Sequence, residues 1–118
     1  MLRERLDEYE AAWNANNFEA LGDFYRGDSV FVPPRADIQR GSAAIAAFLE
    51  EFITGRGLGA AKWTIQDVIY VTDELVFTID TVEIEREGQP AATLKDFLLW
   101  RKIDGIYYIQ YGISNLPA

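Results

Sequence analysis

Two residue types that carry much of protein chemistry are missing from this chain of 118 residues, which contains neither cysteine nor histidine. The lack of cysteine excludes disulfides, a thiol nucleophile and zinc sites of the Cys/His kind. The lack of histidine excludes imidazole acid–base catalysis and the Ser-His-Asp triad. Any catalysis therefore has to rest on Asp, Glu, Tyr, Lys or Arg, or on a bound cofactor. We find no residue pattern that indicates a cofactor or a metal site.

Basic residues are scarce as well, because 11 Lys and Arg stand against 19 Asp and Glu, which leaves a formal net charge of −8. Such a negative field repels phosphate backbones and anionic lipids, so we expect neither nucleic acid nor a membrane as partner. No apolar run approaches the roughly 20 residues that span a bilayer. The N-terminal segment MLRERLDEYE mixes charged and apolar residues, unlike a secretory signal. We therefore expect a cytoplasmic protein.

Apolar residues, by contrast, are plentiful, since 49% of the chain is hydrophobic and 14% is aromatic. This composition argues against disorder and predicts a packed interior. A chain of this length can bury about two thirds of the surface that its unfolded form exposes. We expect one core and a single domain over residues 1–118.

The N-terminal segment predicts an amphipathic helix. Leu2, Leu6, Tyr9 and Trp13 recur at spacings of three and four, which places them on one face of a helix over about residues 2–15. The simplest interpretation of Tyr9 and Trp13 is core packing. The functional alternative for Tyr9 is a phenol that points into a cavity.

Two more helices and a short strand are predicted next. A short helix should run from Phe18 to Tyr25, and residues 29–32 should form a short strand. Pro33 and Pro34 end that strand because proline has no amide hydrogen to donate. A third helix should begin near Ser42, whose hydroxyl can cap it.

Two loops in this half of the chain invite a functional interpretation. Arg35 and Arg40 could hold an acidic ligand, although exposed arginines are more often solvated. Gly55, Gly57 and Gly59 resemble a phosphate-binding loop only superficially, because such loops lie between a strand and a following helix. We expect a flexible connection from helix to strand there.

From Lys62 onward the hydrophobic period is two, which predicts strands. Four long antiparallel strands should follow one another at residues 62–71, 75–86, 91–102 and 106–114. Apolar residues lie on both faces of this meander, whereas a sheet with one wet face shows a cleaner alternation. Three helices cover only one face, so we expect a homodimer through the outer face.

The clearest local signal is Asp104-Gly105, which supplies the two positive-φ positions of a type I′ hairpin turn. One carboxylate, Asp96, then lies on an otherwise apolar face of the hairpin. The alternative is that Asp96 forms an ion pair with a neighbouring basic residue or is solvated. The predicted register pairs Ile103 with Ile106, Trp100 with Ile109, Leu98 with Tyr111, and Asp96 with Ile113.

The segment YEAAWNANNFEALGDFYRGDSVFVPP, followed by RGSAAIAAF, resembles the start of SnoaL-like and ketosteroid isomerase-like proteins. The segment WRKIDGIYYI resembles their closing hairpin. These proteins belong to the nuclear transport factor two-like superfamily, in which three helices pack on a strongly curved four-stranded meander. The resemblance covers nearly the whole chain and implies this cystatin-like α+β cone, with a central apolar pocket for small molecules. It does not imply one activity, because the fold hosts several.

The resemblance also implies roles for single residues. In the isomerases, a tyrosine and a protonated acid form an oxyanion hole, and an aspartate is the base. Tyr9 falls where that tyrosine lies. The base does not carry over, because Pro33 takes its place after the first strand and cannot accept a proton. Counted without gaps from the Asp104-Gly105 turn, the position of the second acid in this family falls on Phe97. We take Asp96, one residue away, as the candidate because it shares its face with apolar residues.

Asp96 and Asp80 are the two carboxylates within the predicted strands whose positions decide whether they can act in a pocket. On a cavity wall Asp96 would lose hydration, so its pKa would rise and it could donate a hydrogen bond or move a proton near neutral pH. Asp80 is a second carboxylate within a strand. Whether Asp80 faces Asp96 depends on the length of the turn at residues 87–90.

Three functions remain open at this stage. The chain could be a binding domain for a small hydrophobic molecule, an acid–base enzyme acting on a steroid- or polyketide-like carbonyl compound, or a structural dimerisation module. The candidate catalytic residues are Tyr9, Asp96 and Asp80. The residues expected to line the pocket and bind a ligand are Trp13, Phe31, Phe52, Trp63, Leu98, Trp100 and Tyr111.

Overall fold

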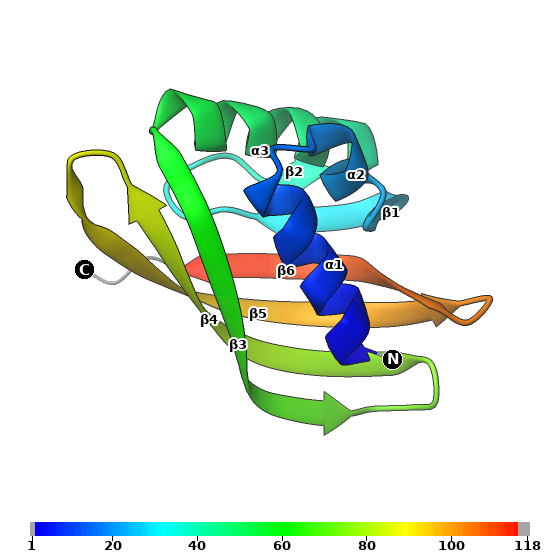
Figure 1. The fold of residues 1–118 in the computed structure, drawn as a ribbon. Helices are drawn as coiled ribbons and strands as arrows, with labels where there is room; N and C mark the ends of the chain where they lie inside the picture. Colours follow the sequence, from blue (N-terminus) through cyan, green and yellow to red (C-terminus); the bar gives the residue numbers. More distant parts are fainter. Residues whose placement is uncertain (1, 116–118) are drawn as a thin grey trace.

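The computed structural model describes residues 2–115, which form three helices and a curved six-stranded sheet. The strands lie across the sheet in the order β2-β1-β6-β5-β4-β3. The helices lie against the concave face of the sheet and leave the outer face uncovered (Figure 1). The expected α+β class is confirmed. The sheet differs from the predicted four-stranded meander because the strands before α3 join it.

Helix α1 (Leu2–Asn14) forms as its apolar spacing predicts. Its C-terminal end is fastened to the sheet by Asn14, whose Nδ2 donates to the Ala61 carbonyl at 3.2 Å and whose Oδ1 accepts from the Ala61 amide at 2.8 Å. This pair of bonds fixes how α1 lies over the concave face. The buried side chains of α1 are Leu2, Leu6, Tyr9 and Trp13.

The second predicted helix is too long. Helix α2 (Phe18–Gly22) has only five residues, and β1 (Tyr25–Val32) begins inside the stretch that the spacing predicts as helix. Pairing with β6 explains the difference: the Ile109 amide donates to the Phe24 carbonyl at 2.7 Å, and Ser29 Oγ donates to the Ile109 carbonyl at 2.7 Å. Strand β1 is therefore longer than predicted and runs parallel to β6.

The predicted cap of the third helix is also wrong. Strand β2 (Gln39–Arg40) pairs antiparallel with β1, and helix α3 (Ser42–Gly55) follows it. The N-cap residue is Gly41, with φ of 88°, and no side chain forms a cap hydrogen bond. The Gly41 amide donates to the Ser29 carbonyl at 2.8 Å, which places the helix start against β1. Glycine suits this position because it tolerates positive φ.

The four long strands form the antiparallel meander that the period of two predicts. They are β3 (Leu58–Tyr70), β4 (Leu75–Arg86), β5 (Gln89–Ile103) and β6 (Ile106–Asn115). Only two residues separate α3 from β3, so most of the glycine-rich segment is strand or helix end rather than the flexible connection we expected.

The closing hairpin has the predicted turn but not the full predicted register. Asp104 and Gly105 have φ of 51° and 80°, the positive values that a type I′ turn requires. The pairs nearest the turn, Ile103 with Ile106 and Trp100 with Ile109, are confirmed. Beyond them β6 contains one extra residue, Gln110, and the pairing shifts. The observed partners are Gly112 for Leu98 and Ser114 for Asp96, so the predicted pairs with Tyr111 and Ile113 are wrong.

Tertiary contacts account for the bulge at Gln110. Gln110 Nε2 donates to the Asp28 carbonyl at 3.0 Å, and Gln110 Oε1 accepts from Arg101 Nη1 at 3.1 Å. The shift also places Gly112 on the concave face, where an added Cβ would lie 3.1 Å from Phe31 and 3.2 Å from Leu98. A side chain at this position would require Phe31 or Leu98 to move by a few tenths of an ångström.

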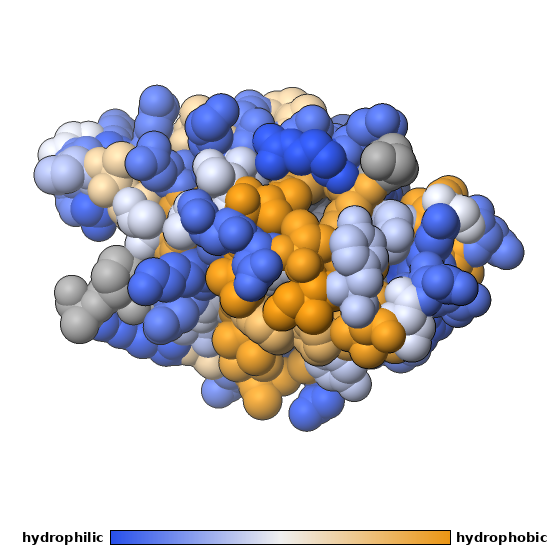
Figure 2. All heavy atoms as spheres, turned by 90° about the horizontal axis from the view of Figure 1, so that it is seen from below, coloured by the Kyte–Doolittle hydropathy of each residue, from blue (hydrophilic) through white to orange (hydrophobic). Residues whose placement is uncertain are grey.

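The outer face of the sheet carries a cluster of apolar side chains, which we call the outer patch. Its residues pair across four neighbouring strands. Phe97 is 39% exposed, Tyr111 is 49% exposed, and the Phe77 and Phe97 rings lie 4.9 Å apart. The view from below shows apolar side chains gathered on this face (Figure 2). The outer patch consists of Ile69, Phe77, Ile79, Phe97, Leu99, Tyr111 and Ile113.

Within residues 2–115, no helix has the length and apolar character needed to cross a bilayer.

Candidate functional site

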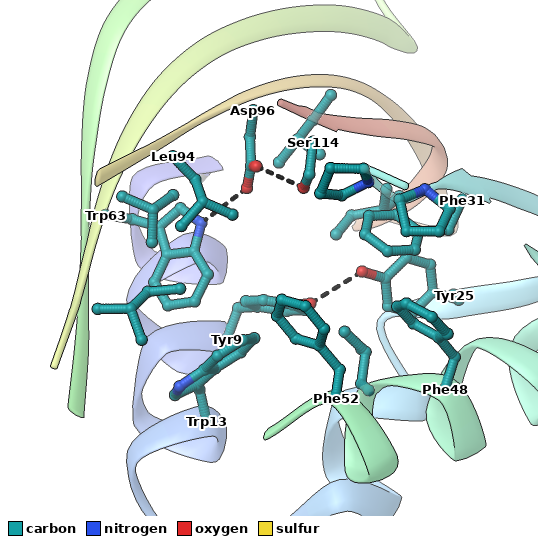
Figure 3. A pocket seen from close by; sticks show the side chains of 17 residues that line it. Tyr9, Trp13, Tyr25, Phe31, Phe48, Phe52, Trp63, Leu94, Asp96 and Ser114 are labelled. Carbon is teal, nitrogen blue, oxygen red and sulfur yellow. Dashed lines mark hydrogen bonds between the residues drawn. The ribbon is translucent and has the colours of Figure 1, made fainter. Parts of the chain in front are cut away.

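An apolar pocket lies between the concave face of the sheet and the helices (Figure 3). It contains about 550 Å³ of empty space, including the part open to solvent at its mouth, but only about 40 Å³ of it admits the centre of a water molecule. Its shape is therefore narrow. Seven of the predicted residues line it: Tyr9, Trp13, Phe31, Phe52, Trp63, Asp96 and Leu98.

Aromatic rings form one wall of the pocket through edge-to-face contacts. The Trp63 ring lies 5.3 Å from Tyr9 and 5.3 Å from Trp13, with interplanar angles of 88° and 73°. Trp13 Nε1 donates to the Gly59 carbonyl at 3.2 Å, which fixes the orientation of that indole. These contacts hold the rings beside the cavity instead of letting them fill it.

Tyr9 and Tyr25 form a hydroxyl pair at one side of the pocket. Their oxygens are 2.8 Å apart, and both side chains are buried. Burial raises the pKa of both phenols, so both remain protonated at ordinary pH. When one hydroxyl donates to the other, the accepting hydroxyl keeps its own proton free. The pair can therefore offer one hydrogen bond to a molecule in the pocket.

Asp96 lies on the other side of the cavity, across from the tyrosine pair (Figure 3). Ser114 Oγ donates to Asp96 Oδ1 at 2.6 Å, and Trp63 Nε1 donates to Asp96 Oδ2 at 3.2 Å. Burial raises the pKa of Asp96 above its usual value, although these two hydrogen bonds oppose the rise. Among the described residues no ion pair involves Asp96, so the alternative of a paired carboxylate is not what the structure shows.

Asp80 is the direct cross-strand partner of Asp96, which answers the question that the sequence left open. Asp80 is fully buried on the concave face but does not line the pocket. Its Oδ2 accepts a weak hydrogen bond from Thr78 Oγ1 at 3.4 Å, and its Oδ1 has no partner among the described residues. Burial, followed by the nearby Asp96 charge, raises the pKa of Asp80 from 3.8 to about 7, with Thr78 and Arg3 opposing the rise.

Two residues predicted to line the pocket do not. The bulge at Gln110 turns Tyr111 to the outer face, where it belongs to the outer patch. Trp100 is fully buried on the concave face and donates from Nε1 to Thr78 Oγ1 at 3.0 Å, but it lies outside the pocket wall. The prediction that these two line the pocket is wrong. Ligand binding by the residues that do line it stays a prediction.

Sequence reasoning missed ten of the lining residues. The apolar spacing places Tyr25 in a helix. The predicted register pairs Asp96 with Ile113 instead of Ser114, because no local sequence signal indicates the bulge. Phe48 and Leu49 were expected on the apolar side of the third helix, and that signal could have placed them here. The missed residues are Tyr25, Pro33, Pro34, Phe48, Leu49, Val82, Ile84, Leu94, Ile109 and Ser114.

The polar groups of the pocket can bind and move protons. Between residues 2 and 115 no group of three or more carboxylates lies close enough to hold a metal ion. The pocket offers instead a tyrosine pair that donates and a carboxyl with a raised pKa. This set suits a molecule with one hydrogen-bond acceptor in an otherwise apolar frame.

A family model described as a SnoaL-like domain matches residues 6–105. Among the curated proteins, none matches significantly. Solved structures share the fold at low identity. A cystatin-like domain of unknown function from Nostoc punctiforme is 16% identical, with a TM-score of 0.85, and the match covers 99% of this chain and 75% of that one.

Two further structures are similar to this chain. An NTF-2-like protein of unknown function from Shewanella oneidensis is 20% identical with a TM-score of 0.83, covering 96% of this chain and 94% of that one. A ketosteroid isomerase-like protein from Erwinia carotovora atroseptica is 16% identical with a TM-score of 0.81, covering 98% and 93%. At these identities the likeness shows the fold alone, and it confirms the predicted cystatin-like α+β fold.

Replacing Asp80 with Asn should raise the free energy of unfolding near pH 8 by roughly 2–4 kcal/mol, and by much less near pH 4. Between 3.8 and about 7, folded Asp80 keeps a proton that the unfolded chain releases. The wild-type protein therefore loses stability as pH rises through this window, and the loss stays constant above it. Urea unfolding followed by tryptophan fluorescence at several pH values measures the difference.

The matched control is Asp73→Asn, which removes a carboxylate from the exposed turn between β3 and β4. This variant should follow the pH dependence of the wild-type protein. An Asp80→Asn profile that runs parallel to the wild-type profile would contradict the raised pKa of Asp80.

Proposed function

The chain belongs to the SnoaL-like domain family, and from this premise we propose that its pocket binds a small, mostly apolar molecule that carries a hydrogen-bond acceptor. The observation that carries the proposal is that the pocket wall is almost entirely apolar and contains only a few polar groups. Apart from the Tyr9–Tyr25 pair and the Asp96–Ser114 pair, almost all the lining side chains are apolar or aromatic. Such a wall favours an apolar ligand and uses few polar groups to orient it.

The narrow shape of the pocket limits the size of this ligand. The free space admits a flat or slender molecule unless lining side chains move. Phe48 and Phe52 are the aromatic side chains of the wall best placed to move, because both are only partly buried; their rings stack with centroids 5.8 Å apart. A single aromatic ring or a short chain fits these limits.

The two polar positions favour a carbonyl oxygen as the acceptor. The free hydroxyl of the tyrosine pair can donate to it, and so can Asp96 when that carboxyl is protonated. Ionised Asp96 would instead repel the oxygen. Affinity for a carbonyl compound should therefore depend on the protonation of Asp96.

Acetophenone should bind about three- to tenfold more tightly below the pKa of Asp96 than above it, because one hydrogen bond is lost on ionisation. Ethylbenzene, which has nearly the same shape and no acceptor, should show no such dependence. In Asp96→Asn the dependence for acetophenone should disappear, since the amide donates at every pH. Saturation-transfer NMR titrations measure these affinities. Equal pH profiles for both compounds would refute the role of Asp96 in binding.

A second candidate is an acid–base enzyme, favoured by the raised pKa of Asp96 beside the cavity. Ionised Asp96 would take a proton from the carbon next to the carbonyl and return it to another carbon. The Tyr9–Tyr25 pair would donate a hydrogen bond to the enolate oxygen that forms meanwhile. Asp96 would have to act as the base, because Pro33 occupies the position at which ketosteroid isomerases carry their aspartate base.

The enzyme candidate predicts that the protein accelerates exchange of the acetophenone methyl protons in D₂O, followed by proton NMR. Asp96→Asn should slow the protein-dependent exchange by roughly 10²–10⁴-fold, because it removes the base. Tyr9→Phe should slow it less, because Tyr25 keeps a hydroxyl. Normal exchange by Asp96→Asn would exclude this mechanism and leave the binding function in place.

We also propose that a second copy of the chain covers the outer patch. Monomeric proteins rarely expose large contiguous apolar surfaces, and one patch can pair with itself across a two-fold axis. Charged residues of both signs border it on the outer face. They are Lys95 and Arg101 on β5, Glu83 on β4 and Asp67 on β3. A rotated copy can therefore offer opposite charges at the rim.

Phe97→Glu should convert this dimer into a monomer, because it places a charge at the centre of the outer patch. Sedimentation velocity at micromolar concentration measures the change. Ile38→Glu is the matched control, since Ile38 is 49% exposed in the loop before β2 and lies outside the patch. A monomeric wild-type protein, or equal effects of the two variants, would rule out this interface.

A further inference from the structure

A second cavity adjoins the apolar pocket, and we call it the arginine groove. Phe52, Ile84 and Leu94 line both cavities, so the groove and the pocket lie on either side of these three side chains. The groove is more polar than the pocket because Arg56 and Arg86 line it as well. An apolar site and a cationic site therefore share one wall.

The groove lies at one end of the molecule. Helix α3 ends there, and the turn between β4 and β5 lies at the same end (Figure 1). Arg56 follows the last residue of α3, and Arg86 is the last residue of β4. Two elements that are distant in sequence thus bring two guanidinium groups to one cavity.

The two arginines have free hydrogen-bond donors. The Arg56 guanidinium lies 4.8 Å from the centre of the Phe52 ring, and Arg86 Nε donates to the Pro90 carbonyl at 2.8 Å. No ion pair within residues 2–115 involves either arginine. The Nη groups of Arg86 and the whole guanidinium of Arg56 donate no hydrogen bond to another described residue. Guanidinium groups suit carboxylates because their planar donors match the two oxygens.

One carboxylate, Glu87, also lines the groove. Its side chain packs over Gly57, where an added Cβ would lie 3.4 Å from Glu87 Oε2. Glu87 is too far from both arginines to form an ion pair with either. It weakens the positive potential of the groove without neutralising it. Removing the Glu87 charge should therefore have the opposite effect on anion binding to removing the arginines.

We propose that the ligand of this protein is an anionic amphiphile whose apolar part occupies the pocket and whose carboxylate lies in the arginine groove against Arg56 and Arg86. This inference rests on the proposed binding function and specifies its ligand class. The net charge of −8 makes most of the surface repel anions, so attraction has to come from local cations such as these. Phe52, which contacts both sites, would lie beside the link between ring and carboxylate.

Matched acids and alcohols test this assignment. The probes are 3-phenylpropanoate, 4-phenylbutanoate and 5-phenylpentanoate. The affinity of each acid, and that of the alcohol with the same carbon chain, is measured by calorimetry in low salt. The acid of best-fitting length should bind about tenfold more tightly than its alcohol, since only the acid accepts charge-assisted hydrogen bonds. The ratio of the two affinities should fall towards one as salt is added.

Variants then separate the groove from the pocket. The double variant Arg56→Gln and Arg86→Gln should abolish the preference for the acid, and Glu87→Gln should strengthen it. Arg26→Gln removes the same charge from β1, which β6 and β5 separate from β4, and should leave the preference unchanged. Because each variant is judged by the ratio of acid to alcohol affinity, a general loss of folding would not imitate the result.

Three outcomes would overturn the inference. Equal binding of acid and alcohol to the wild-type protein, or a preference that survives in the double variant, would remove the arginine groove from ligand recognition and leave the apolar pocket as the binding site. Binding of neither compound class would contradict the proposed binding function itself, and with it the anionic ligand.

Discussion

Gln110 adds one residue to β6, and the alternation of side chains beyond it depends on that residue. With the bulge, Ser114 faces Asp96 from the neighbouring strand and can donate to it, while Tyr111 and its neighbours turn to the outer face. Without it, an isoleucine would face Asp96, and the outer patch would lose two of its members. The pocket and the outer patch are thus two results of one shift in register.

Burial under the helices gives the carboxyl groups of the concave face their chemistry. Asp96 and Asp80 are paired across β4 and β5, on a face that α1 and α3 remove from water. Desolvation favours the neutral forms of both carboxyl groups, and the Asp96 charge raises the pKa of Asp80 further, whereas hydrogen bonds from Ser114 and Trp63 favour the ionised form of Asp96. The same aromatic wall that makes the pocket suitable for an apolar ligand therefore makes its one carboxyl able to hold a proton.

Local sequence patterns were sufficient for much of the fold. The spacing of apolar residues predicted α1 and its buried face, and the period of two predicted β4 with its observed bounds. Asp104-Gly105 predicted its turn because positive φ is a property of those two residues themselves. Part of the site followed from the same patterns, since Tyr9, Trp63 and Asp96 do line one pocket.

By itself, the sequence determined the features that depend on residues near one another in the chain: helix faces, strand periods and the hairpin turn. Tertiary structure alone decided that Tyr25 belongs to a strand, because the pairing of β1 with β6 outweighs its helical spacing. It also decided the bulge, because Gln110 is held by Asp28 and Arg101, and the Asp28 contact joins residues 82 positions apart. Hydrogen bonds across such separations leave no local pattern, so the partner of Asp96 became visible only in the folded chain.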